Sequence, residues 1–212
     1  MSLGKLQQEV LAAFFHLQKG FFLTGGAALS AFYLDHRPTH DLDLFTESDL
    51  LNDGDRTLRT VAAELGATVD EIQTAPDFRR RLLTRSNEGV LVDLVRDRVA
   101  QLEVRKRAFG SVLVDTPTEI QANKLCAILS RSEVRDLVDL AALERFGLPV
   151  DERAIAAACR KDAGLTAAQL AWVLERFTIP ETMPPLGGMT AGDLSRYRDE
   201  LVTRLVRFAR PG

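Results

Sequence analysis

The spacing of apolar residues divides the chain into a first part that mixes helices with strands and a second part that is helical throughout. In the first part, apolar positions recur at helical spacing over residues 3–19, and helices are predicted again over 27–34 and 50–65. Short apolar runs typical of strands cover residues 21–23, 41–45, 67–72, 78–84, 89–95 and 112–114. The runs over residues 78–84 and 89–95 are joined by a short turn and predict an antiparallel hairpin. The pattern therefore predicts an α/β (α+β) fold with a mixed β-sheet flanked by helices.

The second part opens with a strong helix start, Thr-Pro-Thr-Glu, at residue 116. A helix is predicted from Pro117 through Ser130, and its pattern continues toward Phe146. Trp172 is expected in the core of the helical part. Further helices are predicted over residues 151–161, 166–177 and 190–210. We therefore expect two domains, a core over residues 1–115 and a C-terminal helical region over residues 116–212.

Composition narrows the class of protein. The chain has 212 residues, 27% of them charged, and a formal net charge of −3, so it is not a polybasic nucleic-acid binder. No apolar stretch approaches the length of a membrane span, and no signal peptide opens the sequence. Cys126 and Cys159 lie apart in helical patterns and are expected to be reduced thiols. These features predict a cytoplasmic location.

The stretch from Phe21 to Phe45 carries the strongest chemical signal. An apolar run ends in Gly25-Gly26, and a helix-length spacer leads to the strand that holds Asp41 and Asp43. Side chains alternate along a strand, so the two aspartates point to the same face, where Mg²⁺ would offset their repulsion. The glycines lack Cβ atoms, so phosphate oxygens could approach backbone N–H groups at the start of the helix. Together these features predict a nucleoside triphosphate bound through its phosphates and a metal ion.

A third carboxylate, Asp93, interrupts the otherwise apolar strand Val90–Val95. An unpaired charge on a buried strand costs several kcal/mol, so it needs a partner. Placed beside Asp41 and Asp43, Asp93 would complete a site for two Mg²⁺ ions. The alternative is an ion pair with Arg96 or Arg81 at a strand end.

The segment that follows Pro117 carries a stripe of cations. On one continuous helix, Lys124, Arg131 and Arg135 would fall on the same face, with Asp139 nearby. Such a stripe would suit a triphosphate or RNA phosphates. The alternative is a solvated helix face whose cations pair with acidic neighbours.

Both segments resemble a known family. The order of Gly-Gly, helix and D-x-D resembles the DNA polymerase β-like nucleotidyltransferase superfamily. The fuller string TGGAALSAFYLDHRPTHDLDLFT is similar to the AbiEii/AbiGii abortive-infection toxin family within that superfamily. The pattern K-x-x-A…R…R-D-x-x-D is similar to the fourth motif of that family. Its matching positions are Lys124, Ala127, Arg131, Arg135, Asp136 and Asp139.

This resemblance, which covers roughly residues 20–146, implies a nucleotidyltransferase core that moves an NMP from an NTP to an acceptor hydroxyl. The acceptor would be a tRNA 3′ end or a protein, and the protein would be a toxin of a type IV toxin–antitoxin or phage-defence pair with a cognate antitoxin. The catalytic residues would be Asp41, Asp43, Asp93 and Lys124, and the three aspartates would hold two Mg²⁺ ions. Lys124 would neutralise the triphosphate. The implied nucleotide-binding positions are Gly25, Gly26, Ala27, Lys124, Arg131, Arg135, Asp136 and Asp139.

Two departures from the family pattern stand out. Ala27 replaces the Thr or Ser that commonly follows the glycines, and the region after Phe146 is shorter than in many members. Alternatives are a CCA-adding, poly(A)-type or small-molecule nucleotidyltransferase, or a non-catalytic nucleotide-binding or antitoxin-like module. The sequence does not fix the base, the acceptor or the oligomeric state.

Overall fold

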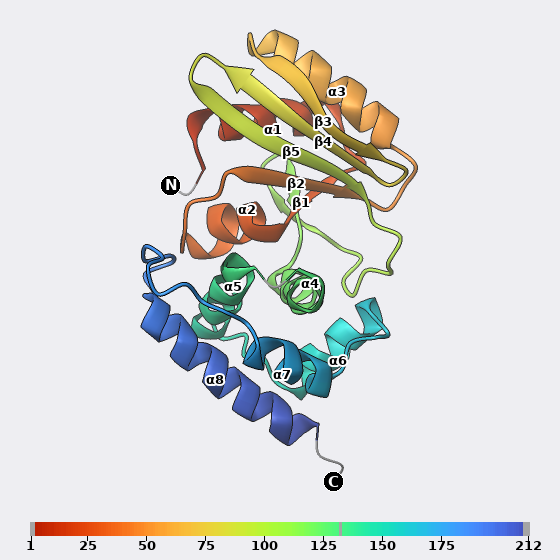
Figure 1. Ribbon diagram of the computed structural model, residues 1–212. Coiled ribbons are helices and arrows are strands. Elements are labelled where there is room, and N and C mark those ends of the chain that lie inside the picture. The colour runs from red at the N-terminus through yellow and green to blue at the C-terminus, as the bar shows by residue number, and fades with distance from the viewer. Residues whose placement is uncertain (1–2, 132, 210–212) are drawn as a thin grey trace. The chain divides into compact units, whose positions relative to one another are not determined.

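A computed structural model describes residues 3–131 and 133–209 (Figure 1). Its packing divides the chain into two compact units. Unit 1 comprises residues 1–99 and 103–116, and unit 2 comprises residues 100–102 and 117–212. The domain boundary expected between residues 115 and 116 stays a prediction, because compact packing does not by itself show that a segment folds independently.

Unit 1 is built on a seven-stranded sheet with the strand order β3-β4-β5-β2-β1-β7-β6. The strands are β1 (Phe22–Thr24), β2 (Asp41–Thr46), β3 (Thr68–Ala75), β4 (Phe78–Arg85), β5 (Glu88–Arg96), β6 (Arg107–Phe109) and β7 (Val112–Val114). Its helices are α1 (Lys5–Leu17), α2 (Gly25–Leu29), the π-helix η1 (Ser30–Leu34) and α3 (Leu51–Glu64). Strand β2 pairs in parallel with β5 and antiparallel with β1, and β1 pairs in parallel with β7. The predicted α/β fold with a mixed sheet is thereby confirmed.

The two faces of the sheet differ in chemistry. Along β2, Leu42 and Leu44 are fully buried, whereas Asp41, Asp43 and Phe45 on the other face are half-buried. Helices α1 and α3 pack on the apolar face, where the T-shaped ring pairs of Phe14 with Phe15 and Phe21 belong to the core. Side chains alternate between the two faces of a strand, so the aspartates of β2 point away from the core that Leu42 and Leu44 enter.

Unit 2 contains five helices among its described residues. They are α4 (Pro117–Ser130), α5 (Val134–Arg145), α6 (Glu152–Lys161), α7 (Ala167–Glu175) and α8 (Ala191–Phe208). Helix α4 packs on α5, α6 and α7, and α8 packs on α7 and α5. Side-chain caps begin three of the helices, since Asp151, Thr166 and Thr190 each accept a backbone N–H of the first turn.

Two expectations for this unit were wrong. The helix that opens at Pro117 does not continue to Phe146, because α4 ends at Ser130 and α5 starts afresh at Val134. Trp172 is 58% exposed and not a core residue. Helix α7 buries Leu170, Ala171 and Leu174, and a residue two positions after Leu170 lies about 200° around the helix, on the opposite face.

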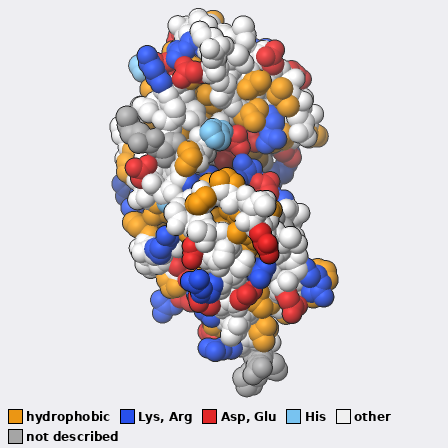
Figure 2. All heavy atoms as spheres, turned by 60° about the vertical axis from the view of Figure 1, so that its left-hand side comes forward, with side chains coloured by type: hydrophobic (Ala, Val, Ile, Leu, Met, Phe, Trp, Pro, Cys, Tyr) orange, Lys and Arg blue, Asp and Glu red, His pale blue; other side chains and the backbone are white. Residues whose placement is uncertain are grey.

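The surface carries both signs of charge. On the face drawn in Figure 2, Lys and Arg side chains are mixed with Asp and Glu side chains. This mixture agrees with the small net charge of −3. Among the described residues, no helix is both long and apolar enough to cross a membrane.

Candidate active site

Asp43 and Asp93 lie side by side in the middle of the sheet. Strands β2 and β5 pair in parallel with Asp43 opposite Asp93, and Thr24 of β1 lies opposite Asp43 on the other side. Arg80 of β4 in turn lies opposite Asp93. Directly paired residues point to the same face, so these four side chains form one line across four strands, which we call the carboxylate row. Asp41 lies on the same face, two residues before Asp43.

The Gly25-Gly26 turn begins α2 next to this row. Gly25 has a φ of +67°, a conformation that disfavours other residues. A Cβ atom at Gly25 would overlap Oδ2 of Asp43, and one at Gly26 would overlap Nη2 of Arg37. From the sequence, we expected phosphate oxygens to occupy the space that the missing Cβ atoms leave. The structure instead places there the side chains of Asp43 and of the buried Arg37.

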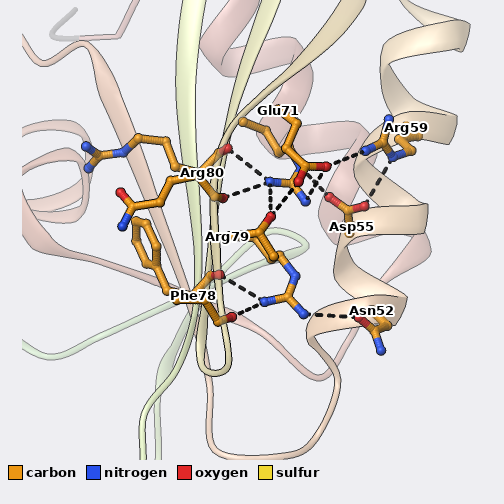
Figure 3. Close-up of polar contacts among 11 residues, drawn as sticks. Asn52, Asp55, Arg59, Glu71, Phe78, Arg79 and Arg80 are labelled. Carbon is orange, nitrogen blue, oxygen red and sulfur yellow. Dashed lines mark hydrogen bonds and ion pairs between the residues drawn. The ribbon is translucent and has the colours of Figure 1, made fainter.

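Arg80 places a positive charge within the row, next to Asp93. Its Nε donates to Asp93 Oδ1 at 2.8 Å and its Nη2 donates to Oδ2 at 2.6 Å, a bidentate ion pair. Hydrogen bonding to Asp93 raises the pKa of Arg80, and the charges of Asp93, Asp41 and Asp43 raise it further. Figure 3 shows Arg80 and Phe78 on the side of β4 away from α3, whereas Arg79 points toward Asn52 of α3. The alternative considered for Asp93, an ion pair with an arginine, is thus what the structure shows, but its partner was wrong: Arg96 pairs with Asp49 and Arg81 with Asp55.

The donor groups of this site decide whether a metal ion fits it. Asp41 and Asp43 offer hard carboxylate oxygens on one face of β2, which is the ligand type that Mg²⁺ prefers. Over residues 3–131 and 133–209, no group of three or more His, Cys, Asp or Glu side chains is arranged to hold a metal. Asp93 holds Arg80 instead. The site therefore fits one divalent ion at Asp41 and Asp43, and ligation by Asp93 stays a prediction.

A buried network of hydrogen bonds around Asp115 holds the end of β1 that precedes the glycine turn. Thr24 Oγ1 donates to Asp115 Oδ2 at 2.8 Å, and Lys106 Nζ lies 2.7 Å from Asp115 Oδ1. Tyr33 of η1 donates its hydroxyl to the Asp115 carbonyl at 2.9 Å. Asp115 thus connects β1, η1 and the segment that precedes β6. This network fixes the end of β1 from which the glycine turn departs.

In unit 2, Lys124 of α4 lies within a buried ion cluster. Its Nζ is 2.7 Å from Asp136 Oδ1 and 2.7 Å from Asp139 Oδ2, both on α5. Both aspartates are 0% exposed and Lys124 is 5% exposed. Arg131 adds a bidentate contact to Asp136 at 2.9 and 3.0 Å. Burial alone would raise the pKa of Asp136, but the charges and hydrogen bonds of Lys124 and Arg131 outweigh it and lower that pKa.

The break between α4 and α5 makes this cluster possible. Twelve residues separate Lys124 from Asp136, which is about 18 Å along one straight helix. The chain turns back after Ser130, so α5 packs on α4 and the two side chains meet. The expected single stripe of cations was therefore wrong. Arg135 pairs with Glu133 at 2.5 Å, as the alternative of local pairing predicted.

The structure thus separates the predicted site residues into two sets. Unit 1 brings together Gly25, Gly26, Asp41, Asp43 and Asp93. Ala27 is buried in α2 beside them, so its methyl group does not face solvent. Unit 2 holds the other predicted residues, which are Lys124, Arg131, Arg135, Asp136 and Asp139.

Sequence reasoning missed three residues of the unit 1 site, namely Arg37, Arg80 and Asp115. For Arg80 a signal existed in the alternation of β4 and the register of the hairpin. For Arg37 and Asp115 the contacts with Gly26 and Thr24 are tertiary, and no local pattern announced them.

Comparisons with known proteins agree with this geometry. The family model described as nucleotidyl transferase AbiEii toxin, type IV toxin–antitoxin system, matches residues 9–203. A crystal structure from H. pylori, solved as a candidate nucleotidyltransferase, superposes with a TM-score of 0.60 at 16% identity, covering 98% of this chain and 96% of that one. JHP933 from Helicobacter pylori superposes with a TM-score of 0.56 at 16% identity, covering 96% of this chain and 91% of that one. No curated protein matches the chain. The two structures show the shared fold, and the family match over most of the sequence shows that the chain belongs to the AbiEii nucleotidyltransferase toxin family.

Proposed function

We propose that the protein is a Mg²⁺-dependent nucleotidyltransferase that transfers an NMP from an NTP to an acceptor hydroxyl and releases pyrophosphate. The observation that carries the proposal is the carboxylate row: Asp43 and Asp93 lie directly opposite each other, next to a glycine turn that leaves room for Asp43. Two carboxylates in direct cross-strand contact repel each other, so this arrangement needs a function to explain it.

Asp41 and Asp43 would hold the ion. Bound there, Mg²⁺ would stabilise the charge that develops on the transferred phosphoryl group. Arg80 holds Asp93 by both carboxylate oxygens and so fixes its orientation beside Asp43. In this arrangement Asp93 can accept a proton from the acceptor hydroxyl, provided that the hydroxyl reaches it. Since Arg80 already compensates Asp93, we favour one ion over the two that the sequence suggested.

The phosphates would lie beside Arg37 near the glycine turn, and not in the space of the missing Cβ atoms, which Asp43 and Arg37 fill. Arg37 is buried with its guanidinium against Gly26, and guanidinium groups bind phosphate oxygens in a bidentate manner. Lys124 was expected to neutralise the triphosphate. Its ammonium group is held by two buried carboxylates, so we assign it first to the stability of unit 2 and assign Arg37 to the phosphates.

The family description supports a toxin role and a cognate antitoxin as partner. For the acceptor, a tRNA 3′ end and a protein hydroxyl remain the candidates, and phage defence is the biological setting that we propose. An acceptor assay decides between the two candidates directly.

The test is transfer of label from each α-³²P-NTP to total RNA and to total protein with Mg²⁺ present. Asp43→Asn is the matched variant, because it removes the charge and keeps the shape. Asp70→Asn is the control, because Asp70 is an exposed aspartate on the edge strand β3. Label in one pool that is lost in Asp43→Asn and kept in Asp70→Asn supports the proposal and names the acceptor. Equal labelling by all three proteins, or none by the wild type, contradicts it.

A second experiment separates the metal from Arg80. The substitution Arg80→Met removes the cation that pairs with Asp93 and so increases the repulsion between Asp93 and Asp43, so Mg²⁺ should raise the melting temperature of this variant more than that of the wild type. The added substitution Asp43→Asn should abolish the Mg²⁺ effect. A Mg²⁺ effect that survives both substitutions would place the ion elsewhere.

A further inference from the structure

A second line of side chains runs beside the carboxylate row on the same face of the sheet. Phe78 of β4 lies opposite Val95 of β5, Val95 lies opposite Phe45 of β2, and Phe45 lies opposite Phe22 of β1. We call these four residues the aromatic row. Each of them follows or precedes a member of the carboxylate row by two positions, so the two rows are about 6.6 Å apart along the strands.

The middle of the aromatic row differs from ordinary core packing. Phe45 and Val95 are half-buried, whereas their neighbours Leu44 and Leu94 on the helix-covered face are 0% exposed. These apolar side chains face away from α1 and α3 and, next to charged carboxylates, remain partly accessible to a ligand. A bound ligand that covers Phe45 and Val95 would account for their placement.

Cations lie at both ends of the row. Lys106 Nζ lies 4.2 Å from the centroid of the Phe22 ring, and the Arg80 guanidinium carbon lies 5.5 Å from that of Phe78. Phe22 and Phe45 are a tilted ring pair at 6.3 Å. The end positions are thus occupied by cation–π contacts, which leaves Phe45 and Val95 as the segment that can take a flat ligand.

We propose that Phe45 and Val95 form the surface on which the base of the NTP stacks. This inference rests on the proposed function, which puts the α-phosphate at the carboxylate row. One ribose separates the α-phosphate from the base, and the spacing of the two rows matches that separation. The glycine turn lies toward the Asp41 end of β2, so the base would extend in the opposite direction from the pyrophosphate.

This surface supplies affinity for a base without reading its identity. An aromatic ring stacks on any base, and loss of one such contact weakens binding roughly 5- to 150-fold. All four NTPs should therefore lose affinity together when the ring is removed. Any preference for one base must come from polar groups outside the aromatic row.

The experiment compares nucleotides with inorganic tripolyphosphate, which carries the phosphates and no base. Calorimetry with Mg²⁺ would measure both ligands on the wild type, Phe45→Ala and Phe45→Leu. The leucine variant keeps apolar volume and so guards against a folding defect. The control is Phe109→Ala, because Phe109 is an exposed ring on β6 that contacts Phe32 and Tyr33 and not the aromatic row.

We expect NTP affinity to fall at least 5-fold in both Phe45 variants, with tripolyphosphate affinity unchanged and Phe109→Ala like the wild type. An equal loss for NTP and tripolyphosphate, or no loss for either, would overturn the proposal. Unchanged NTP affinity together with a higher KM for the acceptor would show that Phe45 binds the acceptor and not the NTP base, and would also overturn the proposal. A wild type that binds no NTP would instead overturn the proposed function, and this inference with it.

An optical readout checks the stacking itself. Trp172 is the single tryptophan and lies on α7 of unit 2, so Trp172→Phe removes the native indole signal. Adding Phe45→Trp places one indole in the aromatic row. NTP should then quench the fluorescence and tripolyphosphate should not. Equal responses to the two ligands would show that the ring senses phosphate binding and not a base.

Discussion

The buried ion cluster of unit 2 gives the sharpest prediction, which concerns replacement of Lys124 by methionine. Methionine keeps most of the volume of the side chain and removes its charge. Asp136 and Asp139 are both 0% exposed, and the ammonium group lies 2.7 Å from each. Removing one partner of a buried ion pair costs about 3–5 kcal/mol, because a charge is left in a poorly solvated site. Arg131 still holds Asp136 after the substitution, which limits the part of this cost that falls on Asp136.

The assay is urea unfolding followed by the fluorescence of Trp172, which reports on unit 2, and by circular dichroism, which reports on both units. We expect Lys124→Met to lower the free energy of unfolding by about 3–5 kcal/mol in the fluorescence transition. Lys124→Met combined with Asp139→Asn should regain about 1–3 kcal/mol, since the charge that the lysine compensated is gone. A loss below about 1 kcal/mol, as for an exposed ion pair, would refute the reasoning.

The same cluster predicts a dependence on pH. The pKa of Asp136 is lowered in the folded protein, so its contribution to stability is fully present above the ordinary carboxyl pKa of about 3.9. That contribution is lost as the pH falls from there through the lowered folded pKa. The difference in unfolding free energy between wild type and Lys124→Met should therefore be larger at pH 7 than near pH 3. A difference that is constant over this range would contradict the assignment.

Two further predictions concern the glycine turn and a thiol. Gly25→Ala should cost more stability than Gly66→Ala, because both glycines have a positive φ, but a Cβ meets Asp43 at Gly25 and nothing within 4 Å at Gly66. The shared strain is about 1–2 kcal/mol, and equal urea midpoints for the two variants would contradict the overlap. Burial raises the pKa of Cys126 to about 11, so its thiol should react with Ellman's reagent at pH 8 roughly 100-fold more slowly in the native than in the unfolded protein. This rate is measured in Cys159→Ser, and native and unfolded rates within 10-fold of each other would contradict it.

Period-two alternation made the centre of the site predictable from the sequence. Asp41 and Asp43 had to share a face, and their apolar neighbours had to turn toward the core. The isolated charge of Asp93 within an apolar strand indicated the same face of a neighbouring strand. What alternation alone cannot give is the order of strands in the sheet. That order comes from the structure, where β2 lies between β5 and β1.

The partner of Asp93 could have been derived from the hairpin. Strand runs over residues 78–84 and 89–95 place Thr84 opposite Gly89, and the same register places Arg80 opposite Asp93, as observed. The alternative considered for Asp93 was an arginine near a strand end, Arg96 or Arg81, and the pairing along the hairpin was not followed. Arg81 is the next residue after Arg80 and so points to the opposite face, where it pairs with Asp55.

The break in the long helix was missed for a different reason. Residues between Ser130 and Val134 contain no proline or glycine, so local propensity offers little to end a helix there. The break is stabilised by a tertiary contact, because only a turn between α4 and α5 lets Asp136 reach Lys124. Helical periodicity relates residues that are three or four positions apart, so it gives no sign of a contact between residues twelve positions apart.

Arg80 is a member of the carboxylate row and also contacts the aromatic row, and this connects the proposals for the metal and for the base. It holds Asp93 through two hydrogen bonds, and its guanidinium lies over the ring of Phe78 at the end of the aromatic row. Asp93 lies directly opposite Asp43, so binding of a divalent ion at Asp41 and Asp43 should draw Asp93 and weaken its hold on Arg80. A guanidinium that moves from Asp93 would also leave the ring of Phe78. Metal binding and base stacking should therefore be thermodynamically coupled through this one side chain, and the coupling must be equal in both directions.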